Sequence, residues 1–180
     1  MAVTDPQSTA PRQTSWMDIR PDDAFRAEDV QGVAVAMLPV SDIARSAAFY
    51  RDLLGLAYRR EFSRGGVVTG CALSAPDDRY ALALRLRDTT PGKADLRDEH
   101  PLIMRVPDRR ILDRVFAHAE ALGVAPTRGE HPDAAWVEVR DPDGICMRFA
   151  VPTRPWHSFV GLRYEDDGTE VLYGNPRLDV

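Results

Sequence analysis

Charged residues alternate with apolar ones in two expected strands of the C-terminal half, and these are the best candidates for chemistry. Glu138 lies between two valines in AAWVEVR (134–140), and Arg148 lies between a methionine and a phenylalanine in ICMRFAV (145–151). Successive side chains of a strand point to opposite faces, so the apolar set should pack on a helix and leave the charged set on the other face. By this alternation, that face comprises Trp136, Glu138, Cys146, Arg148, Ile103, Arg105, Val35, Met37, Cys71 and Arg85, with Tyr58 at its rim.

Glu138 and the arginines suggest acid–base chemistry or the binding of an anion. A carboxylate in a partly apolar site can have its pKa raised toward neutrality and act as a general base, although neighbouring arginines oppose that shift. A guanidinium is planar, always charged and a bidentate donor, so Arg148 or Arg105 suits a carboxylate, phenolate or enolate of a ligand. The structural alternative is an Arg–Glu–Arg network that only pairs its own charges. Cys146 is interpreted as a small buried hydrophobe and not as a nucleophile.

The elements that must position these residues occur twice in the sequence. Val30–Leu56 predicts a buried strand that ends at Pro39, a helix capped by Ser41 or Asp42, and a stop at Gly55. Pro101–Val124 repeats this order: a short apolar strand, V-P-D, an amphipathic helix and Leu-Gly-Val. Such internal repetition indicates two modules of one architecture.

Three further strands are expected in each module. In the first they lie near 57–64, 67–74 and 79–87, with a hairpin at Gly65-Gly66. In the second they lie near 125–130, 134–140 and 145–151, and the last two are joined by the turn Asp141–Gly144. Residues 89–99 are expected to be an exposed linker, and 158–164 with 169–173 a further hairpin.

The stretch from Val40 to Leu56 (VSDIARSAAFYRDLLGL), with the later DPDG turn at Asp141–Gly144, resembles the vicinal oxygen chelate superfamily. That group includes glyoxalase I, bleomycin-resistance proteins and extradiol dioxygenases. The resemblance covers about residues 30–151. It implies an α+β domain (29–151) of two tandem βαβββ modules (30–88 and 100–151), which form one cup-shaped half-open barrel with the ligand on its concave face. It also implies a homodimer.

Two segments lie outside the domain that the resemblance implies. Residues 1–28 are expected to be a disordered or loosely docked N-terminal segment, in which Trp16 could contact the body of the protein. Residues 152–180 are expected to form a C-terminal β-hairpin extension. That extension is open to three interpretations: a packing strap, a dimer contact or a lid over the cup.

The resemblance also implies where metal-dependent members hold their ion, and this chain departs from the pattern. Those members place a His or Gln early in the first strand of each module and a Glu in the last strand. The corresponding residues here are Val35, Pro101 and Arg148, none of which binds a metal. His100 is next to the second position and is expected to point to the opposite face. We therefore expect no metal and no other cofactor, the alternative being relocated ligands such as His100, His131 and Glu138.

The bulk composition limits the classes of partner. The chain has 180 residues, 44% of them hydrophobic, and a net charge of −5. The basic residues are scattered, so no nucleic-acid partner is expected. No apolar run reaches the roughly 18 residues of a membrane span, so no membrane partner is expected either. The N-terminus has no signal-like apolar region and the two cysteines form no CxxC motif, which favours a reduced, cytoplasmic protein.

Together these observations favour a metal-independent protein that binds or transforms a small apolar, oxygenated, aromatic metabolite in its cup. Whether it only binds, or acts as an isomerase, cyclase or lyase through Glu138 and Arg148, stays open. The first alternative is a metal-dependent glyoxalase-type lyase or extradiol-type dioxygenase. The second is a structural or regulatory protein that contacts its partner through residues 152–180.

Overall fold

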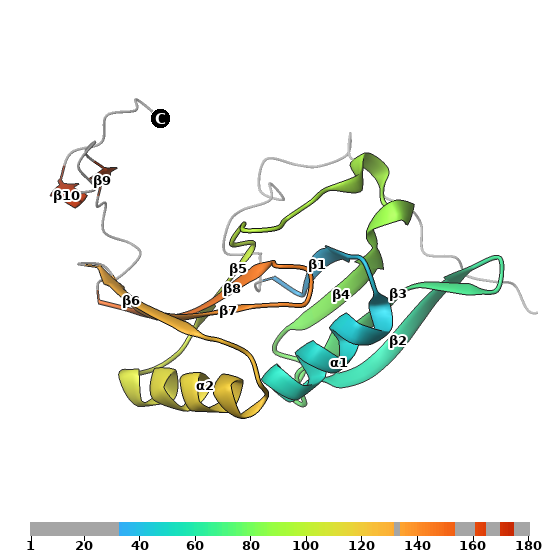
Figure 1. Cartoon of the computed structure of the whole chain (residues 1–180), viewed down its shortest axis with the longest axis horizontal. Helices are drawn as coiled ribbons and strands as arrows, with labels where there is room; N and C mark the ends of the chain where they lie inside the picture. The colour runs from blue at the N-terminus through green and yellow to red at the C-terminus, as the bar shows by residue number, and fades with distance from the viewer. Residues whose placement is uncertain (1–32, 132–133, 154–160, 165–169, 175–180) are drawn as a thin grey trace, which may run out of the picture. The chain divides into compact units, whose positions relative to one another are not determined.

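The structure is a computed structural model, and it describes residues 33–131, 134–153, 161–164 and 170–174. In these residues a strand, a helix and three strands follow one another twice (Figure 1). The first module comprises β1 (Val35–Val40), α1 (Ile43–Leu54), β2 (Ala57–Arg64), β3 (Val67–Ser74) and β4 (Ala81–Leu86). The second comprises β5 (Leu102–Arg105), α2 (Arg109–Ala121), β6 (Thr127–His131), β7 (Ala134–Arg140) and β8 (Cys146–Pro152). The predicted α+β fold with two βαβββ modules is confirmed at this level.

Each module builds a four-stranded mixed sheet of the same topology. The strand orders are β1-β4-β3-β2 and β5-β8-β7-β6. The first strand pairs in parallel with the last, and the remaining neighbours are antiparallel. The helix of each module contacts its own sheet, α1 against β3 and β4 and α2 against β7 and β8. We call the opposite face of each sheet its open face.

The helix boundaries follow from local sequence. The side chain of Asp42 accepts a hydrogen bond from the backbone of Arg45, so Asp42, and not Ser41, is the N-cap of α1. Asp108 caps α2 in the same way. Gly55 ends α1 with a φ of 65°, a conformation that glycine adopts at little cost.

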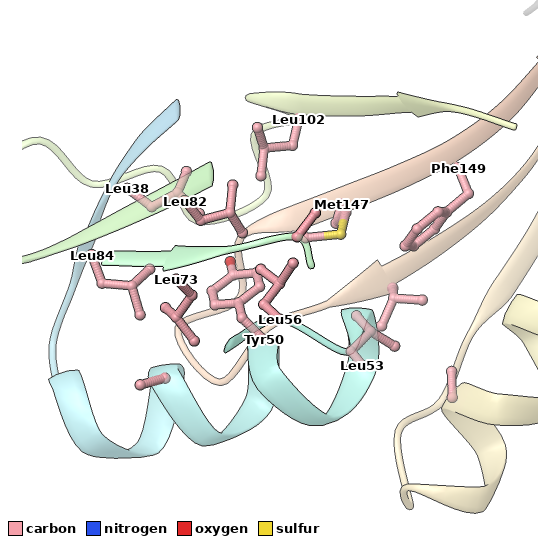
Figure 2. Packing of buried hydrophobic residues seen from close by; sticks show 14 of the residues in the cluster. Leu38, Tyr50, Leu53, Leu56, Leu73, Leu82, Leu84, Leu102, Met147 and Phe149 are labelled. Carbon is pink, nitrogen blue, oxygen red and sulfur yellow. The ribbon is translucent and has the colours of Figure 1, made fainter. Parts of the chain in front are cut away.

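One buried cluster joins the two modules. It contains apolar residues from both sheets and both helices. Figure 2 shows Tyr50 of α1 among Leu56, Leu82 and Met147. The Tyr50 hydroxyl donates a hydrogen bond of 2.9 Å to Asp141, the first residue of the DPDG turn. The α1 helix of the first module is thereby anchored to a turn of the second.

The third residue of the same turn carries the second part of this contact. Asp143 accepts a hydrogen bond from the backbone of Ser41 at 2.9 Å and lies within ion-pair distance of Arg45 and Arg87. Its side chain is only 6% exposed. The turn was predicted from its proline and glycine alone, and its role as the contact between modules was not.

Several boundaries differ from the predictions by one to three residues. β1 continues through Pro39 to Val40, because β1 is an edge strand in which a proline removes no ladder bond that the sheet needs. Residues 89–99 are mostly exposed, as expected for a linker, and 3-10 turns occupy Arg87–Thr89 and Pro91–Lys93.

Beyond the modules, β9 (Gly161–Tyr164) pairs antiparallel with β10 (Glu170–Tyr173), as the predicted hairpin requires. The expectations for residues 1–28, for Trp16 and for the rest of the tail lie outside the described residues. No helix in the described part of the chain is long and apolar enough to cross a membrane.

Candidate functional site

The open face of the second sheet carries most of the predicted site residues. Strand register places Glu138 opposite Arg148, Trp136 opposite Ala150, and Ile103 beside Arg148. Val137 and Val139 of β7 are fully buried on the α2 side, as the alternation requires. Cys146 is on the open-face register but is buried beneath the segment that precedes β5, since its backbone donates to the carbonyl of Glu99.

A polar cluster of His100, Glu138 and Arg148 forms the centre of this face. The Nε2 atom of His100 lies 2.5 Å from Oε2 of Glu138, and Nη2 of Arg148 lies 3.1 Å from the same oxygen. Arg140 is within 3.9 Å of Oε1. The Glu138 side chain is 13% exposed, so this carboxylate is largely removed from water and surrounded by donors.

His100 corrects a sequence-based expectation. It was expected to point away from this face because it is one residue out of phase with the open-face positions. The strand β5 begins only at Leu102, so strand alternation does not apply to His100. The backbone before β5 turns its imidazole toward Glu138. Only the alternative set of relocated metal ligands had placed His100 together with Glu138.

Arg105 corrects a second expectation. It shares the open face through its register with Ala150, but it is exposed and makes no contact with Glu138 among the described residues. The arginines that surround Glu138 are Arg148 and Arg140. The predicted Arg–Glu–Arg network therefore exists with a different second arginine.

Hydrogen bonding fixes the charge state of Glu138. Burial acts to raise the pKa of this carboxyl, but the hydrogen bonds from His100 and Arg148 outweigh burial and hold its pKa below the usual 4.5. An ionised carboxylate only accepts, so the close Nε2 atom of His100 carries the proton between them. Of the two opposing effects considered from the sequence, the donors around Glu138 outweigh its burial.

Arg148 stacks on an aromatic ring and keeps unused donors. Its guanidinium carbon lies 4.6 Å from the ring centre of Trp136, a cation–π contact. Its buried Nε has no hydrogen-bond partner within the described ranges. The Trp136 ring has room because residue 129 on the neighbouring strand is glycine: a Cβ there would come within 2.2 Å of the indole. Arg148 is thus held in place by Trp136 and Glu138, and its buried Nε is left unsatisfied by the described residues.

The open face of the first sheet has a similar pair. Arg85 lies 4.3 Å above the ring of Phe62, and the register places both on the face that carries Met37. Gly70 makes room for this pair, since a Cβ there would approach Arg85 to 2.9 Å. Val35, Met37 and, in the second sheet, Ile103 are 46%, 57% and 55% exposed. Each open face therefore combines exposed apolar side chains with an arginine held on an aromatic ring.

Two residues lie on the other face of the first sheet. Tyr58 is paired with Leu73, and Cys71 with Leu84, both on the α1 side. Tyr58 donates to Glu61 at 3.0 Å, and burial together with Glu61 raises its pKa to about 12. A register irregularity between Tyr58 and Arg60 accompanies this placement. Tyr58 is therefore not at the rim of the open face.

The residues at the usual metal positions do not fit an ion. Val35 and Pro101 have no donor side chain, and Arg148 carries a permanent positive charge. A different trio is better placed: the ligand atoms of His100, Glu138 and Cys146 lie within 4.8 Å of one another. The guanidinium of Arg148, however, lies 3.1 Å from both His100 Nε2 and Glu138 Oε2. Burial and the charge of Glu138 also raise the pKa of Cys146, which opposes the thiolate that a metal needs.

Comparison with known proteins gives a consistent result. A model of the Glyoxalase/Bleomycin resistance protein/Dioxygenase superfamily matches residues 32–149. No curated protein sequence matches the chain.

Similar solved structures include TnmS3, an antibiotic binding protein from Streptomyces sp. CB03234 (20% identity, 69% of this chain and 98% of that one, TM-score 0.53). Another is a superfamily member from Sphaerobacter thermophilus (18% identity, 68% and 98%, TM-score 0.56). A third is a lactoylglutathione lyase from Agrobacterium tumefaciens (20% identity, 68% and 94%, TM-score 0.55). At these identities the likeness establishes the fold alone.

Proposed function

Because this chain belongs to the glyoxalase/bleomycin resistance protein/dioxygenase superfamily, we propose that it is a metal-independent binder of a small, oxygenated, aromatic metabolite. The ligand lies in a cup formed by the open faces of the two sheets, in a homodimer of the kind common in this superfamily. Exposed apolar side chains of β1 and β5 form its walls, and the polar cluster of the second sheet orients its oxygen atoms.

The observation that carries this proposal is the state of Arg148. The Arg148 side chain is 28% exposed beside an apolar face, and its contacts with described residues leave part of the guanidinium available to a ligand that accepts a hydrogen bond. Trp136 and Glu138 hold the guanidinium in place, which reduces the entropy that binding has to remove. A carboxylate, phenolate or enolate meets the remaining donors best.

Binding is favoured over proton-transfer catalysis by the environment of Glu138. Two donors already occupy this carboxylate, and its pKa lies below the usual value. A general base at neutral pH requires the opposite shift. TnmS3, a similar structure, is an antibiotic binding protein, which agrees with a binder in this family. If the protein were an enzyme, Glu138 would be its base and Arg148 its oxyanion holder.

The test is a ligand screen with aromatic acids and polyketide-like compounds, followed by calorimetry on variants. We expect Arg148→Met to weaken binding of a hit at least about tenfold, since a charge-assisted hydrogen bond of roughly 1.5–3 kcal/mol is lost. Glu138→Gln should retain binding within a few-fold. If Arg148→Met binds the hit as tightly as the unmodified protein does, the proposed site is wrong. If Glu138→Gln binds normally but stops turnover of the hit, the protein is an enzyme.

A metal-dependent lyase or dioxygenase is the second candidate, and the trio of His100, Glu138 and Cys146 is the observation that favours it. Imidazole, carboxylate and thiolate together suit a borderline-soft ion such as Zn²⁺. This candidate requires Arg148 to move away from His100 Nε2 and Glu138 Oε2, the two ligand atoms that it now contacts. It predicts that a chelator abolishes ligand binding or turnover, whereas the metal-free binder is unaffected.

A further inference from the structure

A hollow of the first module lies between its helix and strands, on the side opposite the open face. It has a volume of about 680 Å³, within the range of small-molecule sites. We call it the α1 groove. Its lining comprises Ser41, Asp42, Ile43, Ala44, Ala47, Ala48 and Arg51 around α1, with Tyr58, Glu61, Val68, Leu73 and Leu86 from the strands. None of these residues belongs to the polar cluster of the proposed metabolite site.

The second module has a corresponding hollow beside α2, which differs from the α1 groove in volume and in charge. The equivalent hollow beside α2 has only about 390 Å³. Two ion pairs span it, one from Arg109 of the helix to Glu130 of β6 and one from Asp113 to Arg128. Counting from the capping aspartates, Arg109 and Asp113 correspond to Ile43 and Ala47. In the first module these helix positions are therefore apolar, and they leave the hollow unspanned.

Among the described residues, the α1 groove has an unpaired negative charge, because its other charged lining residues are engaged in an ion pair or a helix cap. Arg51 forms an ion pair with Asp52 at 2.7 Å and is neutralised. Glu61 accepts a hydrogen bond from Tyr58 but has no cationic partner within the part of the chain that the structure describes. Asp42 is occupied as the helix cap, so it offsets the positive end of the helix. Glu61 is the charge that remains for a ligand.

Tyr58 gives the same end of the groove an aromatic surface. Tyr58 is 46% exposed, and Val68, which also lines the groove, is 40% exposed. Aromatic rings and carboxylates together are the groups that recognise organic cations, since the ring face and the carboxylate both attract positive charge. The small alanines of α1 leave space for an apolar body next to them.

We propose that the α1 groove is a second binding site, which takes a small apolar organic cation with Glu61 as its counter-ion and Tyr58 as its aromatic wall. The site is separate from the proposed metabolite site. It needs neither Arg148 nor a metal, so its test is independent of the proposed function.

The test uses two probes of the same shape and opposite charge, tetraphenylphosphonium and tetraphenylborate. Equilibrium dialysis of the full chain should show saturable binding of one phosphonium per chain, at least about tenfold tighter than the borate. Glu61→Gln should weaken phosphonium binding about fivefold, the size of an exposed charge pair of about 1 kcal/mol. Ala44→Leu should abolish it, because leucine fills the groove from an exposed helix position that tolerates it.

Glu120→Gln, an exposed change on α2, is the matched control and should leave binding unchanged. Equal binding of the two probes, or unchanged phosphonium binding in Glu61→Gln, would overturn the proposal. Binding that survives in Ala44→Leu would place the cation elsewhere and overturn it as well. A groove covered by a second copy of the chain would show no probe binding and a lower mass for Ala44→Leu in light scattering, which also contradicts the proposal.

Discussion

Among single residues, Arg148 matters most for the proposed function, because of the way its guanidinium is held. Its guanidinium contacts Trp136 on one side and Glu138 on another. Each of these two contacts depends on a further residue. Gly129 lets the indole lie across β6, and His100 completes the donors around the carboxylate. The arginine is therefore part of a built site and not a solvated surface charge.

Gly129→Ala tests this packing. The new methyl group would overlap the Trp136 ring, so the indole must shift and its contact with Arg148 is disturbed. We expect a loss of about 1–3 kcal/mol in the free energy of unfolding, which is typical of overpacking, and a change in tryptophan fluorescence. Gly174→Ala, where an added Cβ meets nothing within 4 Å, should change neither. Unaltered fluorescence and stability in Gly129→Ala would contradict the packing described here.

The charge of Glu138 makes a prediction about acid stability. Because the folded-state pKa of Glu138 is below its usual 4.5, its ionisation stabilises the fold fully above that value. This contribution is lost as the pH falls through the lower folded-state pKa. We expect Glu138→Gln to be less stable than the unmodified protein at pH 7, with the gap closing in denaturant titrations as the pH falls below 4.5. A gap that is constant over this range would mean that the ion pair contributes nothing.

At the scale of the element, the DPDG turn before β8 connects the modules through α1. Its first aspartate is 5% exposed, and burial raises the pKa of Asp141 despite the hydrogen bond from Tyr50. The turn also determines where β8 begins, because the backbone of Ile145 donates to the Asp141 side chain. The position of Arg148 on β8 thus depends on a contact with the other module.

Tyr50→Phe removes the hydroxyl that Asp141 accepts from, in a fully buried place. We expect the free energy of unfolding to fall by about 1–3 kcal/mol, since a buried acceptor loses a partner. Tyr80→Phe is the matched control, because the Tyr80 hydroxyl makes no hydrogen bond in the ranges that the structure covers. Chemical denaturation measures both. Equal effects of the two changes would show that the Tyr50–Asp141 bond is not a stabilising contact.

The elements were predictable from sequence where the signal is local. The limits of β2, β3 and β7 follow from alternation and turns, and capping chemistry narrowed the start of α1 to Ser41 or Asp42, of which Asp42 is the cap. His100 and Tyr58 were misplaced because a loop and a strand irregularity interrupt that alternation. The Tyr50–Asp141 bond joins residues 91 positions apart, and no local pattern encodes such a contact.

At the scale of the whole molecule, the two modules have the same topology but different chemistry. The second carries the polar cluster on its open face and ion pairs beside its helix. The first has an apolar open face with Arg85 and an unspanned groove beside its helix. In the proposed function the second module orients the ligand and the first supplies apolar surface, so both are needed for binding.

We propose that the protein works without a metal ion and that Arg148 stands where metal-dependent members have a ligand. The most direct test is the metal content of the protein. Mass spectrometry would be applied to the purified protein before and after incubation with Fe(II), Zn(II), Mn(II) and Ni(II). We expect far less than one ion per chain in every sample, with no difference between the unmodified protein and His100→Ala. One retained ion per chain that is lost in His100→Ala would contradict this proposal, and would assign His100, Glu138 and Cys146 to a metal site.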